Sequence, residues 1–275
     1  MRLMLSSDIY GNDLIRRKNN ESSSILQKND LRIESIQKPT PKLGEVVIKV
    51  MACGICGTDV HIFHGDEGAA PTPAGTVLGH EFAGVVEAIG DGVKGVAVGD
   101  RVCVDPNKLC NECYYCKSGI GHFCEDMIGI GTTVNGGFSE YCVVPESQVY
   151  KIADTTTFEM AAMTEPVACC VHGIDMCNIS CGDTVAVIGG GMIGLIMLQL
   201  AKISGAGKLI LIEPVEEKRE MAKKLGADIC IELHILPNGP HGMSVCTEDV
   251  EAKSEYNGRW VEWSIMWLNE IFQWK

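Results

Sequence analysis

The stretch that decides the fold reads Thr184-Val-Ala-Val-Ile-Gly-Gly-Gly-Met-Ile-Gly194. Its first five residues form a short apolar run of the kind found in buried strands, and its last three open a longer apolar run that predicts a helix. Between the two lies the pattern Gly-x-Gly-x-x-Gly, with glycines at Gly189, Gly191 and Gly194. A strand that passes through this pattern into a helix is typical of dinucleotide-binding domains.

The chain on either side continues an alternation of strand and helix. The glycine pattern leads into a predicted helix over Met192–Ile203, followed by a strand at Leu209–Ile212 and a charged helix, Glu216–Leu225, that stops at a glycine. Upstream, residues 156–159 match a capping box and predict a helix that continues from 161 to 176. This order predicts the start of a doubly wound parallel sheet, a partial Rossmann domain, over residues 156–233.

A carboxylate ends the second predicted strand of this domain. Glu213 follows Gly194 by 19 residues, which is the spacing of the acidic residue that binds ribose hydroxyls and repels a 2′-phosphate. The sequence therefore predicts NAD, with NADP less favoured, and the pyrophosphate at the helix N-terminus. Lys218 and Arg219 lie close by and weaken the exclusion of NADP. A glycine-rich turn without a ligand is the alternative.

The preceding part of the chain, residues 31–155, predicts a β-rich, barrel-like domain. Short strand-like runs separated by glycine and proline occur at 31–36, 45–50, 82–89, 100–104 and 141–144. Residues 1–30 are polar, with Asn-Asn-Glu-Ser-Ser-Ser at 19–24, and predict a poorly structured extension.

Four closely spaced cysteines lie in the β-rich domain. A tetrahedral zinc ion takes four thiolates, and two-residue spacings let one tight loop present several sulfurs to the same point. Such a closed site stabilises a lobe and does no chemistry. The sequence predicts a structural zinc at Cys110, Cys113, Cys116 and Cys124.

A second group combines a thiolate, an imidazole and a carboxylate, at Cys56, His80 and Glu81. That set suits an open, catalytic zinc site, although Cys53 and Cys56 alone would also match a redox pair. Glu165 lies in an otherwise apolar helical segment and is a further candidate, with a solvated surface acid as the alternative.

Composition narrows the partners and the compartment. The net charge of −13 disfavours nucleic acid and anionic membranes. Residues 1–10 lack the pattern of a secretory signal, so we expect a reducing, cytoplasmic setting in which the fourteen cysteines favour metal over disulfides. The longest uncharged run, residues 184–201, is interrupted by glycines, so no membrane span is expected.

The chain resembles the zinc-containing medium-chain dehydrogenases, nearest to their sorbitol, threonine and butanediol dehydrogenase branch. The match runs from about Leu31 to Glu232 and includes Gly-His-Glu at 79–81, Val-Gly-Asp-Arg-Val at 98–102, the cysteine lobe, Gly-Gly-Phe-Ser-Glu-Tyr at 136–141 and Glu-Pro at 165–166. The resemblance implies a GroES-like catalytic domain ahead of the Rossmann domain, and two zinc ions per chain.

The resemblance also implies roles for single residues. Catalytic zinc would be held by Cys56, His80 and Glu81, with Glu165 as a ligand or second-shell residue. Thr58 and His61 match the family's proton relay. Without a role in catalysis, they would be a hydroxyl in a turn and a histidine on the surface. The family's cofactor contacts carry over to Ile193, Glu213 and Lys218.

These features predict hydride transfer between a secondary alcohol or polyol and NAD. Zinc, as a Lewis acid, lowers the pKa of the bound alcohol, so that an alkoxide forms near neutral pH. Histidine suits the exit of the proton because its pKa lies close to working pH. The family further suggests a homo-oligomer.

The last part of the chain departs from the family. Residues 234–275 show no strand–helix alternation, and all four tryptophans fall in the last 16 residues. The sequence therefore predicts a chain truncated at its C-terminal side, with a tail that is either an amphipathic helix or the product of a shifted reading frame. A catalytically inactive zinc-binding fragment stays open as the second function, and a zinc-free quinone reductase as a third.

Overall fold

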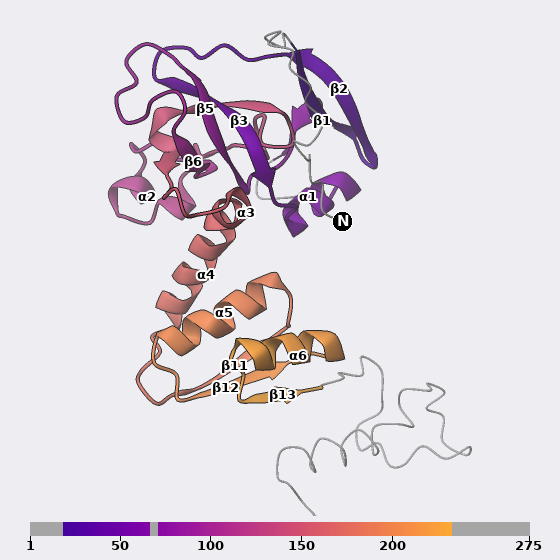
Figure 1. Ribbon diagram of the computed structural model, residues 1–275, viewed down its shortest axis with the longest axis vertical. Coiled ribbons are helices and arrows are strands. Elements are labelled where there is room, and N and C mark those ends of the chain that lie inside the picture. The colour runs from indigo at the N-terminus through magenta and orange to yellow at the C-terminus, as the bar shows by residue number, and fades with distance from the viewer. Residues whose placement is uncertain (1–18, 67–70, 233–275) are drawn as a thin grey trace, which may run out of the picture. The chain divides into compact units, whose positions relative to one another are not determined.

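The computed structural model describes residues 19–66 and 71–232, and the chain divides into two compact units (Figure 1). The first unit runs from Met1 to Pro166 and the second from Val167 to Lys275. The expected tail helix and residues 1–18 lie outside the described residues. Among the helices that the structure describes, none combines the length and apolar character that crossing a bilayer requires.

A five-stranded antiparallel sheet is the centre of the first unit. Its strands follow the order β10-β6-β5-β3-β9, with bounds β3 Glu45–Cys53, β5 Phe82–Ile89, β6 Arg101–Val104, β9 Tyr141–Pro145 and β10 Val149–Lys151. All but the short β10 were predicted from their apolar runs. Alternate apolar side chains from these strands form one core, which includes Val46, Ile48, Phe82, Val86, Val102 and Val144.

An N-terminal hairpin lies beside this sheet, where the sequence predicted an irregular segment. Strands β1 (Asn19–Gln27) and β2 (Asp30–Gln37) pair antiparallel, and β1 also pairs with β4 (Thr76–Val77). The expectation of a poorly structured chain up to residue 30 is therefore wrong for residues 19–30. Polar composition misled it, because the Asn20 amide makes strand-like hydrogen bonds of 2.8 and 2.9 Å with the main chain of Tyr141.

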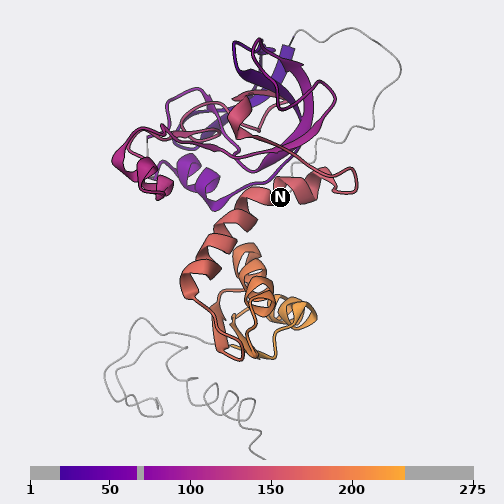
Figure 2. The same cartoon turned by 90° about the vertical axis from the view of Figure 1, so that its left-hand side faces the viewer.

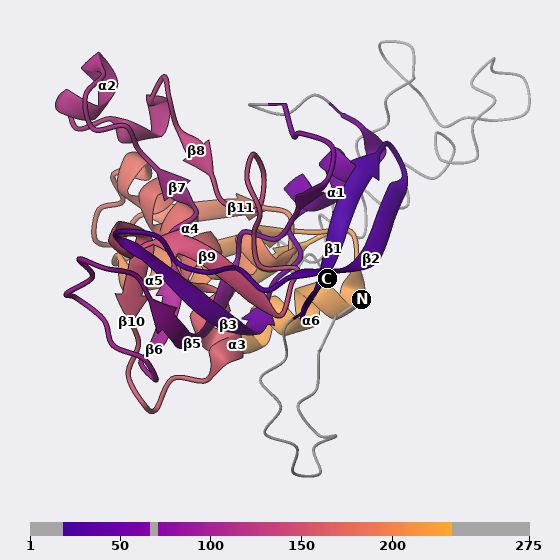
Figure 3. The ribbon, with the colours of Figure 1, turned by 90° about the horizontal axis from the view of Figure 1, so that it is seen from above.

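Short elements complete the first unit. Helix α1 spans Gly57–His64, and a lobe holds β7 (Asn107–Lys108), α2 (Tyr114–Lys117), the 3-10 turn η1 (Gly121–Phe123) and β8 (Ile128–Gly129). A second 3-10 turn, η2, covers Glu146–Gln148. Strands β7 and β8 pair with each other, and the segment with α2 extends from them (Figure 3).

The helix predicted to begin near residue 156 is two helices. Thr157, and not Thr156, is the N-cap of α3 (Phe158–Ala162), and its hydroxyl accepts a hydrogen bond from the Met160 amide. Helix α4 (Thr164–Cys177) begins two residues after α3 ends. Pro166 explains the break, because it has no amide hydrogen for the carbonyl four residues earlier.

The second unit contains the predicted parallel sheet. Strands β11 (Thr184–Ile188), β12 (Lys208–Ile212) and β13 (Ile229–Ile231) pair in that order, and the βαβ alternation is confirmed. Helices α5 (Met192–Ile203) and α6 (Glu216–Leu225) pack on one face of this sheet (Figure 2). Their shared core includes Leu198, Ala201, Leu209, Leu211, Ala222 and Cys230.

Candidate metal and dinucleotide sites

Three predicted ligands come together although they lie on separate elements. Cys56 is the N-cap of α1, whereas His80 and Glu81 immediately precede β5. The ligand atoms of the three residues all lie within 4.8 Å of one another. His80 and Glu81 are buried, and Cys56 is partly exposed. Three protein ligands are the number that a catalytic zinc site provides, with the fourth position left for water or substrate.

Two glycines make room for this group. A Cβ atom at Gly54 would overlap the carboxylate of Glu81, and the Gly54 amide donates a 2.7 Å hydrogen bond to the Glu81 carbonyl. Gly79 has φ 92°, and a Cβ atom there would strike the ring of Phe138. The backbone thus approaches the ligands more closely than any larger residue would allow.

Asp59 is a functional residue that the sequence analysis did not single out. Its side chain is buried, and Oδ2 accepts a 2.9 Å hydrogen bond from the amide of Cys56. Oδ1 accepts a 3.3 Å hydrogen bond from the Gly79 amide and lies 3.6 Å from His80 Nδ1. One carboxylate therefore fixes the backbone beside two ligands. The available signal was its place as the third helical residue after Cys56, where a capping-box acid belongs.

The charges of the group suit a cation. Burial lowers the pKa of His80, but its interactions with Asp59 and Cys56 outweigh burial and raise that pKa to about 10. The same interaction with His80 is the main cause that lowers the pKa of the Cys56 thiol. His80 Nδ1 is buried without a hydrogen-bond partner in the described part of the chain. A zinc ion fits this donor set, because it replaces the shared proton and binds a thiolate and a neutral imidazole.

Glu165 lies near this group but outside the cluster of three. It belongs to the first turn of α4 and is half-buried, which disfavours the interpretation as a fully solvated acid. Burial is the main cause that raises the pKa of Glu81, and the negative charge of Glu165 raises it further. The two carboxyl groups are thus close enough to interact.

The two predicted relay residues share one face of α1. Thr58 Oγ1 lies 3.6 Å from the sulfur of Cys56, so the hydroxyl borders the candidate metal site. His61 follows by three residues, which places both side chains on the same side of the helix. Its imidazole is 72 % exposed, and Nδ1 lies 2.9 Å from Asp66 Oδ2. Both side chains are exposed, and Thr58 lies at the end of the helix next to the candidate metal site.

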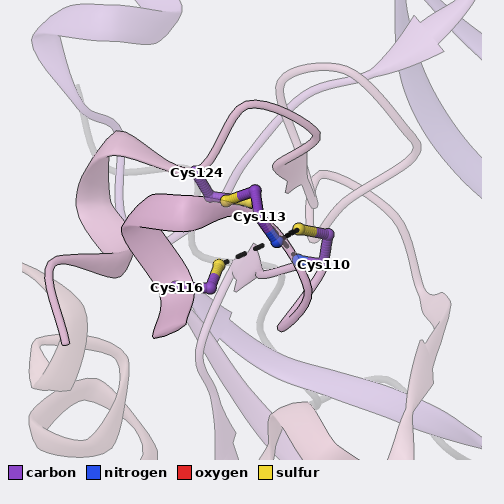
Figure 4. Close-up of side chains that lie close together, drawn as sticks. All are labelled: Cys110, Cys113, Cys116 and Cys124. Carbon is purple, nitrogen blue, oxygen red and sulfur yellow. Dashed lines mark hydrogen bonds between the residues drawn. The ribbon is translucent and has the colours of Figure 1, made fainter. Parts of the chain in front are cut away.

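The four cysteines of the lobe converge as predicted, and their thiols are free of disulfides (Figure 4). Cys110 and Cys116 place their sulfurs 3.9 Å apart, and the Cys113 amide donates to the Cys110 sulfur at 3.4 Å. Backbone amides of Cys116 and Glu125 lower the pKa of Cys113 to about 6. Burial and the neighbouring thiols, in contrast, raise the pKa of Cys116 to about 12, because thiols packed this closely oppose one another's ionisation unless a cation such as zinc is bound.

The glycine turn of the second unit has two kinds of glycine. A Cβ atom at Gly194 would overlap the carbonyl oxygen of Gly189, which itself has φ 98°. At Gly191, the N-cap of α5, a Cβ atom would have no neighbour within 4 Å. The fold therefore requires Gly189 and Gly194, whereas Gly191 leaves space in front of the helix N-terminus for an anion. Ile193 follows in the first turn of α5 and is 48 % exposed.

Glu213 holds the backbone of this turn by hydrogen bonds. Its buried carboxylate accepts hydrogen bonds from the amides of Gly190 (2.6 Å) and Val215 (2.9 Å). Lys218 packs at the same turn, since its Cβ lies 3.2 Å from the Cβ position of Gly190. The guanidinium of Arg219 is committed elsewhere, because it donates to the carbonyl of Glu213 at 2.8 Å and pairs with Glu232. Only Lys218 of the two basic residues is thus available near Glu213.

With the geometry in place, comparison with known proteins identifies the class. Residues 42–154 match the alcohol dehydrogenase GroES-like domain, and residues 192–236 match the zinc-binding dehydrogenase domain. Together they take in more than half of the chain. The chain belongs to the zinc-binding dehydrogenases of the alcohol dehydrogenase family, and the predicted combination of a GroES-like and a Rossmann-type domain is confirmed.

Its relatives are named dehydrogenases and a sensing protein. The chain is 39 % identical to the starvation-sensing protein RspB of Escherichia coli over 80 % of this chain and 64 % of the relative. It is 41 % identical to L-threonine 3-dehydrogenase of Pyrococcus horikoshii over 71 % of this chain and 56 % of that enzyme. The crystal structure of the short chain alcohol dehydrogenase RspB from E. coli CFT073 with NADH is similar, with a TM-score of 0.74 and 38 % identity. The match covers 78 % of this chain and 63 % of that one. The chain thus spans less than two thirds of the length of these relatives.

Proposed function

We propose that this chain carries the catalytic and cofactor residues of a zinc-dependent oxidoreductase that transfers hydride between a secondary alcohol or polyol and NAD. The observation that carries the proposal is the meeting of Cys56, His80 and Glu81, with ligand atoms within 4.8 Å. Relatives named as threonine dehydrogenases and an RspB structure with NADH support the choice of reaction and cofactor. The cysteine lobe would hold the second zinc ion.

Each residue of the site has a distinct task. When bound, zinc supplies Lewis-acid chemistry that lowers the pKa of an alcohol. Asp59 keeps His80 and the Cys56 backbone in place, and Glu165 stands beside Glu81 as a ligand or as a second-shell carboxylate. The hydroxyl of Thr58 accepts the alcohol proton, and the imidazole of His61 passes it to solvent.

The cofactor site belongs to the second unit. The amides at the N-terminus of α5 would bind the pyrophosphate in the space left by Gly191, beside Ile193. Glu213 would exchange its bond to the Gly190 amide for ribose hydroxyls, with Lys218 at its side. The donors of Arg219 are engaged with backbone carbonyls, so Lys218 is the one basic side chain of the two that could bind a 2′-phosphate, and the carboxylate of Glu213 would repel that phosphate and favour NAD over NADP.

The test is turnover by the full chain loaded with zinc. We expect NADH to form with butanediol, sorbitol or threonine, and more slowly with NADP in place of NAD. A variant Glu213→Ala should lose the preference for NAD. Zinc bound at both clusters without any turnover would refute the proposed reaction.

The second candidate is a catalytically inactive protein that binds zinc and a nucleotide. Both candidates predict two zinc ions, so metal content does not separate them. Turnover does, because the inactive protein would bind NADH and zinc but never reduce NAD.

A further inference from the structure

The end of α1 is closed by a double connection between two residues. His61 Nδ1 lies 2.9 Å from Asp66 Oδ2, and the Asp66 amide donates a 3.0 Å hydrogen bond to the His61 carbonyl. Gly65 makes this possible with φ 71°, since the left-handed conformation turns the chain back onto the helix. The backbone conformation at Gly65 and Asp66 therefore places the Asp66 carboxylate next to the His61 imidazole.

The turn between β1 and β2 braces this arrangement. The Asn29 amide donates a 2.7 Å hydrogen bond to the Phe63 carbonyl, and the Asn29 side-chain oxygen lies 3.1 Å from His64 Nδ1. The side chain of Lys28 lies over Gly65, 3.1 Å from its Cβ position. The end of the relay helix is thus held from two sides.

The charged groups around Asp66 are His61, His64 and Lys28. The hydrogen bond with His61 is the main cause that lowers the pKa of the Asp66 carboxyl, ahead of the charges of the three cations. His64, in contrast, faces the neutral amide of Asn29. Of the two histidines of this helix, His61 has a carboxylate at Nδ1 and His64 has an amide oxygen there.

A carboxylate at Nδ1 determines which ring nitrogen is free. When Nδ1–H donates to Asp66, the lone pair of the neutral imidazole is on Nε2. We propose that Asp66 is a positioning residue for His61, which holds the imidazole in the tautomer that accepts the relayed proton at Nε2. The inference rests on the proposed function, in which His61 is the exit of the relay.

The proton balance of this step is simple. The proton that leaves the alcohol hydroxyl passes through Thr58 to Nε2, and the ring becomes an imidazolium that still donates Nδ1–H to Asp66. Nε2 then gives its proton to a water molecule, and the neutral tautomer returns. The carboxylate thus keeps one proton on Nδ1 throughout the cycle, and its removal leaves either ring nitrogen free to carry that proton.

The experiment is NMR of the full chain labelled with ¹⁵N-histidine, in which the chemical shifts of Nδ1 and Nε2 report which nitrogen carries the proton of the neutral ring. His61 and His64 are assigned by the loss of their signals in His61→Gln and His64→Gln. We expect Asp66→Asn to reduce the Nδ1–H tautomer of His61, because the carboxylate that accepts this hydrogen bond is lost. Asp66→Glu, which keeps the carboxylate, should restore most of the Nδ1–H tautomer. Asp91→Asn removes one charge from the turn after β5 and should leave the tautomer of His61 unchanged. An equal share of the Nδ1–H tautomer in wild type and Asp66→Asn would overturn the inference.

A kinetic arm relates the tautomer to the relay. In alcohol oxidation, the relayed proton goes to the free Nε2, so Asp66→Asn should lower kcat with KM for NAD unchanged, and Asp66→Glu should restore most of kcat. A changed tautomer with an unchanged kcat would overturn the link to the relay. If His61→Gln turns over as fast as wild type, the relay in the proposed function fails, whereas the NMR measurement still decides whether Asp66 positions His61.

Discussion

At the scale of single residues, we expect zinc binding by the cysteine lobe to require each of its four thiolates. The variant Cys113→Ser removes the sulfur whose pKa is already lowered to about 6 by backbone amides. We expect the zinc content to fall by one ion per chain and the thermal midpoint to fall by at least about 5 °C, since structural zinc contributes directly to folding. Mass spectrometry of bound metal measures the first, and calorimetry the second.

The matched control for this variant is Cys177→Ser. Cys177 is an exposed, free thiol at the end of α4. The control should keep the wild-type zinc content. A Cys113→Ser protein with as much zinc as the control would show that the four thiols do not form a metal site.

Asp59 offers a second prediction at this scale. In Asp59→Asn, one of the two carboxylate oxygens becomes an NH₂ group, so either the Cys56 amide or the Gly79 amide loses its acceptor, and the negative charge beside His80 is lost. Removal of such an outer-shell partner typically costs 10–100-fold in metal affinity, and we expect a loss in that range. Competition with a chromophoric chelator measures it. Unchanged affinity relative to Asp91→Asn would contradict the role assigned to Asp59.

At the scale of elements, the glycine turn before α5 separates folding from binding. In Gly194→Ala, the new methyl group overlaps the backbone oxygen of Gly189, which cannot move without opening the turn. In Gly191→Ala, the methyl group meets nothing within 4 Å. We expect the first variant to unfold several degrees earlier, and the second to keep its thermal midpoint but bind NADH at least about tenfold more weakly.

Calorimetry and titration of NADH fluorescence test this pair of variants. The same substitution, Gly to Ala, is made three residues apart, so each variant is the control of the other. Wild-type affinity for NADH in Gly191→Ala would place the cofactor somewhere other than the N-terminus of α5.

The elements also show where sequence patterns succeed. Residues 192–203 and 216–225 were predicted as helices with the bounds that the structure has, because apolar periodicity and the stop at Gly226 are local signals. Strand β1 was missed because its buried positions hold Asn20, Ser22 and Ser24, which belong to no apolar pattern. The break before Pro166 was missed because the capping signal at Thr156 predicted one continuous helix. A proline is tolerated in the first turn of a helix, and Pro166 therefore marks the start of α4.

At the scale of the whole molecule, both metal clusters belong to the first unit. Removal of zinc by a chelator should therefore loosen residues 42–154 and leave residues 184–231 unchanged. In the part of the second unit that the structure describes, no group of three or more acids, cysteines or histidines could hold a metal ion. Hydrogen exchange followed by mass spectrometry measures each segment in one experiment. Equal loss of protection in both units would contradict this division.

The second unit exposes an apolar side chain at the edge of its parallel sheet. Strand β11 is an edge of the three-stranded sheet, and Ile188 at its end is 80 % exposed. Parallel sheets are usually covered on both faces, and among the described residues α5 and α6 cover one face of this sheet.

The sequence by itself determined the family, the parallel βαβ unit and the four-cysteine lobe. Each of these is written in short segments, as a glycine spacing, an apolar period or a run of thiols, and so depends on neighbours along the chain. Only the tertiary structure decided that Cys56 meets His80 and Glu81, and that Asp59 reaches the amide of Gly79. The physical reason is that polar contacts between distant segments have no period in the sequence, and exist only once the backbone has brought the groups within hydrogen-bonding distance.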